Sequence, residues 1–547
     1  MGRLLLAVVL AAILVGPASA APRPAPRAAR GGQIVDALGQ PIFVLGANYE
    51  GPVDRAWQMW DDGLFDARAI GRDFDRARAA GVAVLRIFVQ RSLADDIRAA
   101  RWTKLDRVLE LADQRGLRLI LTFADYTEVE LARLVQIDVA VARRYRGRPT
   151  IFAYDLKNEP RFGDLALAEY PPTLFPTLQH PLLVAALGET VAPEGIAAYR
   201  ATDEGRRDIP QRFSDDRAYV YANVLAAYRR FLQDAQTWAI ANGATSVRYA
   251  VSPDSATWDP LKGALDETFA AWMKPRLEAL RAADPERLIT VGHADPILAS
   301  LSANRWLDYR TVHRYPPATS EGIRASMALL DDLRAALPDS PLVLGEFGFS
   351  NATVDEETSS ALETEMARAA CNHGAAGALK WMVNDYPKGA NPRENAFGMF
   401  RADGSPKPIV GAFRALEALR PLDQPLTTHE ARPPDYDLCD GHFFTQTSGT
   451  QIGAAADAAG AGYSVTNADG IPFWDAFQQL GGVPSLGYPI GRRFLLDGWV
   501  VQPLQRGTLR WRPTDQRVEL LRSGAGVAGA RTAIAVPSEA LAPEPAP

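Results

Sequence analysis

Two strand-like segments of the sequence each end on a glutamate. The first, IFAYDLKNEP (151–160), is apolar until it reaches Asn158 and Glu159, and the second, PLVLGEF (341–347), carries Glu346 near its end. Side chains alternate between the two faces of a strand, so each glutamate shares a face with apolar residues. Two carboxyl groups that face one another suit glycoside hydrolysis, in which one protonates the leaving oxygen and the other attacks the anomeric carbon.

The placement of these glutamates distinguishes them from ordinary surface charges. A single loop glutamate is usually a solvated carboxylate, and we would prefer that interpretation for either one alone. Pro160 follows Glu159 directly and cannot continue a sheet ladder, so it fixes the point where Glu159 leaves the strand. A pair at two strand ends favours the catalytic interpretation.

The elements that must position this pair alternate between strands and helices. Eight apolar strands are predicted, at 43–49, 82–89, 117–124, 151–157, 287–293, 309–315, 341–347 and 377–383. Amphipathic helical stretches lie between these strands, and such alternation of strands and helices is typical of βα units around a parallel sheet. This pattern predicts an α/β protein with a closed (β/α)8 barrel, the TIM barrel, and it places both glutamates at one mouth of that barrel.

The connection after the fourth strand is unusually long. Residues 161–284 form an insertion with a predicted helix at 217–242 and a further strand predicted at 245–252. Loops that follow barrel strands lie on the face where barrel enzymes keep their active sites. The insertion should therefore overhang the cleft.

The N-terminus has the features of a secretory signal. Arg3 precedes an apolar run at 4–15 and the small residues before Ala20, which predicts a signal peptide at 1–20 and a disordered leader at 21–32. The apolar run is shorter than the roughly 20 residues that span a bilayer, so no membrane span is expected. We expect a secreted, extracellular protein.

Composition divides the remainder into four parts. The barrel domain should extend over 33–420, followed by a Pro-rich linker at 421–437, a small β-rich or α+β module at 438–523 and a disordered tail at 524–547.

Charge and motif content exclude several classes of function. The net charge is −6 and no Lys/Arg block occurs, so nucleic acid is not an expected partner. The six histidines show no metal-ligand spacing. The G-x-G-x-x-G at 524–529 is not followed by a βαβ unit, so it does not indicate a dinucleotide site. Taken together, these two observations predict neither a bound metal nor another cofactor.

The only two cysteines are Cys371 and Cys439. A single bridge between them and a buried free Cys371 on a helix are both consistent with the sequence.

Over most of 33–417 the chain resembles family 5 of the clan A retaining glycoside hydrolases, the cellulase and β-mannanase group. The resemblance rests on the Asn-Glu-Pro motif after strand four, the glutamate after strand seven, the opening IVDALGQPIFVLGANYEG and the closing NAFGMFRADGSPKPIVGAF. It implies that Glu159 is the acid/base, that Glu346 is the nucleophile, and that Asn158 donates to the 2-hydroxyl of the sugar being cleaved.

Four other positions match the family. Arg86 in LRIF resembles the arginine that keeps the nucleophile charged, although a plain ion pair with Asp155 is the alternative. His313 and Tyr315 in VHRYP match the His-x-Tyr of strand six, whose tyrosine bonds the nucleophile, and Trp381 in LKWMVND matches the floor under the sugar. A buried core aromatic is the alternative for Tyr315 and Trp381.

The chain departs from many family members after strand three. It has Asp125 and Tyr126 where they have a histidine, which is closer to the β-mannanase-like branch. The resemblance implies β-mannan or β-glucan substrates, as polysaccharide or oligosaccharide, and double displacement with carboxyls about 5 to 5.5 Å apart. Glu346 should raise the pKa of Glu159. Loop aromatics that could contact further sugar units are Trp57, Trp60, Tyr126 and Trp258.

The C-terminal module contains a G-x-P-x-x-G-Y-P pattern at 482–489 and resembles small modules on secreted bacterial proteins, some linked to the cell envelope. Envelope contact through this module is one expectation. Its indoles, Trp474, Trp499 and Trp511, more often serve as core of a small fold than as glycan contacts. A non-catalytic glycan-binding barrel of the cell envelope is the alternative function.

Overall fold

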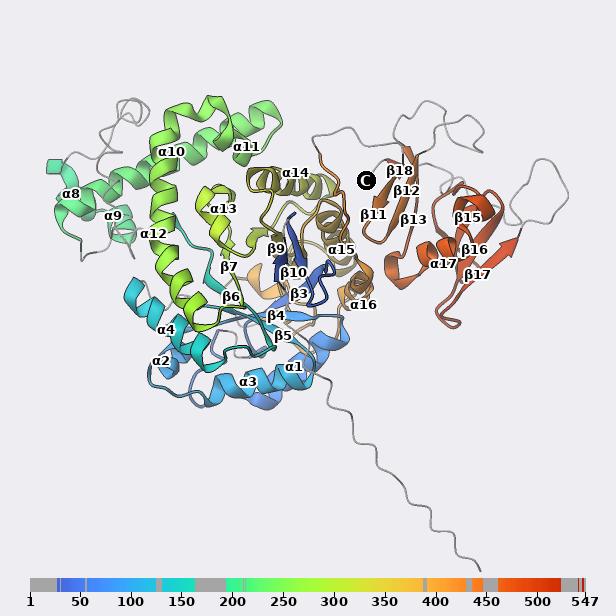
Figure 1. The fold of residues 1–547 in the computed structure, drawn as a ribbon, viewed down its shortest axis with the longest axis horizontal. Coiled ribbons are helices and arrows are strands. Elements are labelled where there is room, and N and C mark those ends of the chain that lie inside the picture. The colour runs from blue at the N-terminus through green and yellow to red at the C-terminus, as the bar shows by residue number, and fades with distance from the viewer. Residues whose placement is uncertain are drawn as a thin grey trace, which may run out of the picture.

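The structure is a computed structural model that describes residues 27–29, 31–54, 57–123, 130–162, 193–209, 211, 213–386, 391–428, 435–445, 461–522, 540 and 544–545. Its centre is a closed barrel of eight parallel strands in the order β10-β3-β4-β5-β6-β7-β8-β9 (Figure 1). Predicted segments 1–20 and 421–437 lie wholly or partly outside the described residues.

All eight barrel strands fall where the sequence predicts them. Their bounds are β3 Val44–Tyr49, β4 Val84–Phe88, β5 Arg118–Thr122, β6 Ile151–Asn158, β7 Leu288–His293, β8 Arg310–Arg314, β9 Leu342–Phe347 and β10 Gly377–Lys380. The (β/α)8 prediction is confirmed. Because all strands run in parallel, their carboxyl ends meet at one mouth of the barrel.

Helices surround the barrel, and side-chain caps set where several of them begin. Asp66 accepts from the backbone N–H groups of Arg68 and Ala69 at the start of the first helix, and Asp355 caps another in the same way. The main helices outside the insertion are α1 Ala67–Ala79, α2 Arg91–Arg98, α3 Thr103–Gln114, α4 Leu131–Arg144, α13 Pro296–Ser300, α14 Ser320–Ala336, α15 Glu356–Asn372 and α16 Ile409–Ala415.

The insertion is helical in its described part. It contains α8 Ile196–Arg200, α9 Asp203–Asp208, α10 Asp215–Asn242, α11 Ser246–Val251 and α12 Asp259–Ala283. The helix predicted at 217–242 is confirmed as α10. The ring of Tyr228 on α10 lies 5.7 Å from that of Phe162, three residues after Glu159, so this helix packs beside the barrel mouth.

The strand predicted at 245–252 is wrong, because this segment forms helix α11. The side chain of Thr245 accepts a hydrogen bond from the backbone N–H of Arg248, which starts a helical turn. Val247, Tyr249 and Ala250 are buried. A short apolar run can be buried as a strand or as a helix, and alternation alone does not separate the two.

In its described residues the C-terminal module contains two four-stranded antiparallel sheets and two short α-helices. The strands are β11 Asp435–Leu438, β12 Gly441–Thr445, β13 Ala461–Thr466, β14 Phe494–Leu496, β15 Trp499–Leu504, β16 Gly507–Trp511, β17 Val518–Arg522 and β18 Glu544–Pro545. The helices are α17 Phe473–Gln479 and α18 Gly482–Leu486. Trp474 and Trp511 pack against the module's core, whereas Trp499 lies under the guanidinium groups of Arg510 and Arg512.

A disulfide joins the module to the barrel. Cys371 near the end of α15 is bonded to Cys439, which decides between the two alternatives that the sequence left open. An ion pair of 3.3 Å between Arg368 and Asp440 lies one helical turn away. The module therefore sits beside α15 and α16 (Figure 1).

Two short strands occur where the sequence predicted disorder. In the predicted leader, β1 Arg27–Ala29 pairs with β2 Gln33–Val35, and in the predicted tail β18 pairs with β13. Antiparallel pairing uses backbone groups, so a Pro- and Ala-rich composition does not exclude it. Among the described residues, the longer helices are too polar to cross a bilayer.

Candidate active site

Both predicted glutamates lie at the carboxyl ends of barrel strands. Glu346 belongs to β9, and Glu159 directly follows β6, where its backbone N–H donates to the carbonyl of Gly292 at 2.8 Å. Glu159 has φ 43°, in the left-handed region that costs a residue with a Cβ free energy. Such strained positions concentrate at functional sites.

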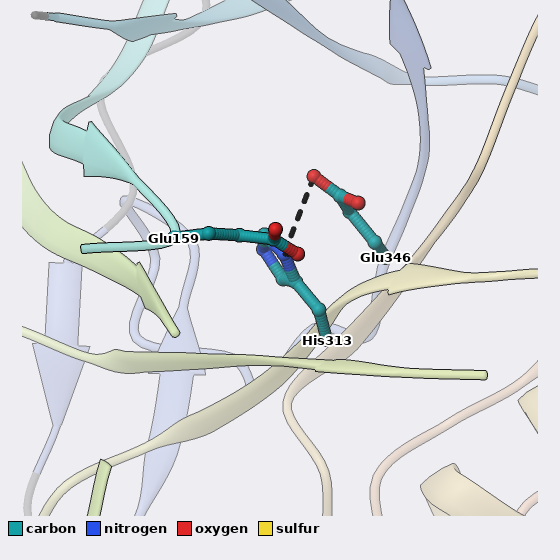
Figure 2. Close-up of side chains that lie close together, drawn as sticks. All are labelled: Glu159, His313 and Glu346. Carbon is teal, nitrogen blue, oxygen red and sulfur yellow. Dashed lines mark hydrogen bonds and ion pairs between the residues drawn. The ribbon is translucent and has the colours of Figure 1, made fainter. Parts of the chain in front are cut away.

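The two carboxylates point toward one another across the mouth of the barrel (Figure 2). One oxygen of Glu159, one oxygen of Glu346 and a ring nitrogen of His313 all lie within 4.8 Å of each other. Carboxyl pairs of retaining glycosidases are about 5 to 5.5 Å apart, and those of inverting enzymes about 6.5 to 9.5 Å. Two oxygens within 4.8 Å of each other are closer to the spacing of retaining enzymes than to that of inverting enzymes.

Arg86 lies beneath the pair and contacts several acceptors at once. Its Nη1 donates to Oε1 of Glu346 at 2.6 Å, and its Nε and Nη2 donate to Oδ2 of Asp155 at 2.9 and 2.8 Å. Further bonds go to Asn48 at 3.0 Å and Asn158 at 2.8 Å. Burial alone would lower the pKa of Arg86, but Asp155 and Glu346 outweigh it and raise the pKa, so the guanidinium stays charged. Arg86 therefore pairs with Glu346, as the resemblance implies, and also with Asp155, which was the alternative interpretation.

Tyr315 holds the other oxygen of Glu346. Its hydroxyl donates to Oε2 at 2.7 Å, and burial together with the charge of Glu346 raises the pKa of Tyr315 well above its ordinary value. The tyrosine therefore keeps its proton and acts as a donor. Both oxygens of Glu346 accept from fixed donors, which orients this carboxylate.

Asn158 and Trp381 border the same opening. The side-chain oxygen of Asn158 accepts from Arg86, which leaves its amide nitrogen to donate elsewhere. The ring of Trp381 lies 6.1 Å from that of Phe88, and the Trp381–Met382 peptide bond is cis. The structure thus brings all seven predicted site residues to one mouth.

His313 has a position that the sequence did not define. Its Nδ1 is 2.9 Å from Oε1 of Glu159 and 3.3 Å from Oε1 of Glu346. The sequence matched this histidine to a motif without giving it a partner. In the structure it contacts both carboxylates.

The expected shift of Glu159 is wrong in sign. Burial raises the pKa of Glu159. The hydrogen bond with His313 and the electrostatic influence of His313, Arg86 and Arg161 together lower the pKa by more than burial raises it, so the net pKa lies below its ordinary value. The prediction considered only the repulsion from Glu346. It missed His313, which lies nearer to Glu159.

A buried ion pair behind the site was also missed. Lys380 bonds Glu363 at 2.6 Å and the carbonyls of Trp381 and Phe397 at 3.0 and 2.9 Å. The ring of Phe397 lies 5.6 Å from that of Tyr315. Lys380 therefore holds the backbone of Trp381, and it also holds the backbone of a residue whose ring packs against Tyr315. A lysine in an apolar strand was visible in the sequence, but its partner on α15 was not.

Glu159, His313 and Glu346 are also residue types that could hold a metal ion. However, the charged guanidinium of Arg86 already contacts the Glu346 oxygen that is nearest to His313. A cation at that oxygen would lie against Arg86, so electrostatics disfavour metal binding. Asp125 and Tyr126 lie outside the described residues.

Comparison with known proteins gives only distant matches. No protein-family model and no curated protein sequence matches this chain. Among solved structures, an exo-β-1,4-mannosidase from Opitutaceae bacterium strain TAV5 is 16% identical with a TM-score of 0.45, and the match covers 71% of this chain and 61% of the mannosidase.

Two other matches are similarly distant. A β-glucuronidase from Ruminococcus gnavus is 15% identical with a TM-score of 0.42, covering 72% of this chain and 52% of the glucuronidase. A GH5_18 variant from Streptomyces cattleya, in complex with Manβ1-4GlcNAc, is 16% identical with a TM-score of 0.44, covering 69% and 79%. The chain thus spans less than two thirds of the mannosidase and of the glucuronidase. Likenesses this distant do not define an activity.

Proposed function

We propose that this protein is a retaining β-glycosidase of the family 5 type. The observation that carries the proposal is the pair Glu159 and Glu346, which face one another with their nearest oxygens within 4.8 Å at the mouth of a (β/α)8 barrel. Arg86 and Tyr315 hold one member of the pair and leave the other more exposed. This asymmetry assigns different roles to the two carboxyls.

In the proposed reaction Glu346 attacks the anomeric carbon while Glu159 protonates the departing oxygen. The covalent glycosyl-enzyme is then hydrolysed by a water molecule that gives its proton to Glu159, and the anomeric configuration is retained. Asn158 donates to the 2-hydroxyl, and Trp381 lies under the apolar face of the sugar.

Glu159 must be protonated before it can act, although its pKa is lowered in the free protein. A sugar that enters between the carboxylates excludes water from Glu159, and burial is the influence that raises this pKa. Substrate binding therefore shifts Glu159 toward the protonated form.

We further propose β-mannan or β-glucan chains as the substrate class and an extracellular location, with envelope contact through the C-terminal module. The disulfide between Cys371 and Cys439 supports export, because disulfides persist in oxidising compartments. Cell fractionation of the full chain, with and without residues 438–523, tests this part. A protein that stays in the cytosol would contradict it.

Chemical rescue tests the catalytic roles. Glu346→Ala and Glu159→Ala should each remove most turnover of aryl β-glycosides, and added azide should restore turnover with opposite product anomers, α for the first and β for the second. Glu417→Ala is the matched control, because Glu417 is a half-exposed surface carboxylate that pairs with Arg78, away from the barrel mouth. A non-catalytic glycan-binding barrel would show no turnover in the unmodified protein and no rescue.

A further inference from the structure

Lys380, the last residue of strand β10, carries a charge that is buried behind the barrel mouth. Its Nζ lies 2.6 Å from Oε1 of Glu363 on helix α15, and the two side chains are 1% and 2% exposed. Taking two charges out of water is costly, and apolar residues of similar volume often stabilise a fold as well as such a pair does. Stability alone therefore does not account for this pair, and the groups bonded to it indicate its role.

The pair is bonded to three separate segments of backbone. Nζ of Lys380 donates to the carbonyl of Trp381 at 3.0 Å and to that of Phe397 at 2.9 Å. Together with the bond to Glu363, these contacts use all three donors of the ammonium group. Oε1 of Glu363 also accepts from the backbone N–H of Phe349 at 3.0 Å. The segment after β9, the end of β10 and the returning segment around Phe397 thus meet at one ion pair.

Each of these segments is connected to the candidate active site. Phe349 lies three residues after Glu346, the proposed nucleophile, and Trp381 is the proposed floor under the sugar. The ring of Phe397 lies 5.6 Å from that of Tyr315, whose hydroxyl donates to Glu346. The ion pair is therefore one short segment or one ring contact away from the nucleophile, from its hydrogen-bond donor and from the floor.

Gly348 shows how closely these segments approach one another. A Cβ at this position would lie 2.6 Å from the carbonyl oxygen of Trp381, 3.1 Å from the ring of Phe397 and 3.4 Å from Oε1 of Glu363. Only glycine fits there without a shift of the neighbouring backbone. Because close-packed interiors transmit strain, a displacement of the ion pair also displaces Trp381 and the segment that follows Glu346.

A second buried lysine connects the same segments at residues farther along the chain. Lys407 donates to Oδ1 of Asn351 at 2.7 Å and to Oδ1 of Asp385 at 2.8 Å. The same oxygen of Asp385 accepts from the backbone N–H of Gly398 at 2.7 Å. These bonds remain when Lys380 is replaced, so the replacement should shift the segments and not release them.

We propose that Lys380 and Glu363 are positioning residues, which set the place of the Trp381 ring and of the Glu346 carboxylate relative to the sugar. They act through the backbone and do not touch the substrate. The inference rests on the proposed function. A misplacement of about 1 Å can cost about 100-fold in rate, so the effect should fall on kcat more than on KM.

Kinetics of matched variants tests the inference. Lys380→Met should lower kcat on an aryl β-glycoside about 10- to 100-fold and change KM by less than about threefold. Arg287→Met is the matched control, because Arg287 forms an equally buried pair with Asp284 directly before β7, at the end of the barrel opposite the mouth. The control should lower the urea midpoint to a similar degree and keep kcat within about twofold.

The double variant Lys380→Met with Glu363→Leu separates positioning from stability. It removes both buried charges, so its urea midpoint should recover toward that of the unmodified protein. Its kcat should remain low, because the carbonyls of Trp381 and Phe397 still lack their donor. Recovery of kcat together with the midpoint would assign the pair a purely structural role and overturn the inference.

A spectroscopic measurement tests the position of Trp381 without any substrate. In protein labelled with 5-fluorotryptophan, the fluorine resonance of Trp381 is assigned by its loss in Trp381→Phe. This resonance should shift in Lys380→Met and in the double variant, and it should keep its position in Arg287→Met. An unshifted resonance in Lys380→Met overturns the inference even when the unmodified protein is an active glycosidase.

The proposed function can fail separately from the position of the ring. An unmodified protein that cleaves no β-glycoside overturns the proposed function and the catalytic part of the inference. The fluorine resonance of Trp381 then decides alone whether the ion pair positions this side chain.

Discussion

The Nη1 atom of Arg86 lies 2.6 Å from Oε1 of Glu346, and both side chains are almost inaccessible to solvent inside the barrel. The same guanidinium is bonded to Asp155, which is equally buried. One positive charge therefore serves two buried carboxylates. Such an arrangement is weak evidence for net stability, but breaking it is costly because charges are left uncompensated.

Replacement of Arg86 by methionine should lower the free energy of unfolding by about 3 to 5 kcal/mol and abolish turnover. Urea denaturation, followed by tryptophan fluorescence, measures the first effect. Arg78→Met is the matched control, since it removes the half-exposed pair with Glu417 and should cost no more than about 1 kcal/mol. Similar losses in the two variants would contradict the role given to the network.

Tyr315→Phe removes one donor from Glu346 and leaves the ring. A hydrogen bond to a charged group contributes about 1.5 to 3 kcal/mol, so kcat should fall roughly 10- to 100-fold. The contact between the rings of residue 315 and Phe397 should persist, and thermal unfolding should change little. Steady-state kinetics on an aryl β-glycoside measures the effect. An unchanged kcat would mean that Tyr315 only packs.

The pH profile should report the contact between His313 and Glu159. Because His313 lowers the pKa of Glu159, His313→Ala should raise that pKa and move the basic limb of kcat/KM to higher pH. His442→Ala in the module is the control, and its profile should match that of the unmodified protein. A basic limb that moves to lower pH would contradict the assignment of Glu159 as the acid.

The same contact has a consequence for stability. A carboxyl whose pKa is lowered by folding contributes stability that is present above its unfolded-state pKa and is lost as the pH falls through the folded-state pKa. The stability of His313→Ala should therefore depend less on pH in this acidic range than that of the unmodified protein. Urea midpoints at a series of acidic pH values measure the difference.

The disulfide should stabilise the fold. It links residues 68 positions apart, and the chain-entropy account gives about 4 kcal/mol for a loop of that length. Cys371→Ser with Cys439→Ser should lower the free energy of unfolding by about 2 to 5 kcal/mol, with aryl glycoside turnover preserved at low temperature. Reducing agent should destabilise the unmodified protein alone. Equal stability of the two proteins would contradict this.

The sequence alone determined the eight strands and the two glutamates at their ends. These features are local, because the alternation of apolar side chains that indicates a strand occupies fewer than about ten consecutive residues. Pro160, which ends the strand before it, lies directly after Glu159. The position of the mouth followed from the parallel arrangement of such strands. The resemblance to a known family supplied the remaining five site residues.

Only the tertiary structure decided which of these groups interact and how. The sign of the pKa shift of Glu159 depends on His313, 154 positions away, and the pair Arg86 and Glu346 spans 260 positions. Whether 246–251 is a helix and whether Trp57 is exposed were likewise set by packing. Electrostatic and packing energies depend on distances through space, and a sequence specifies those distances only after the chain has folded.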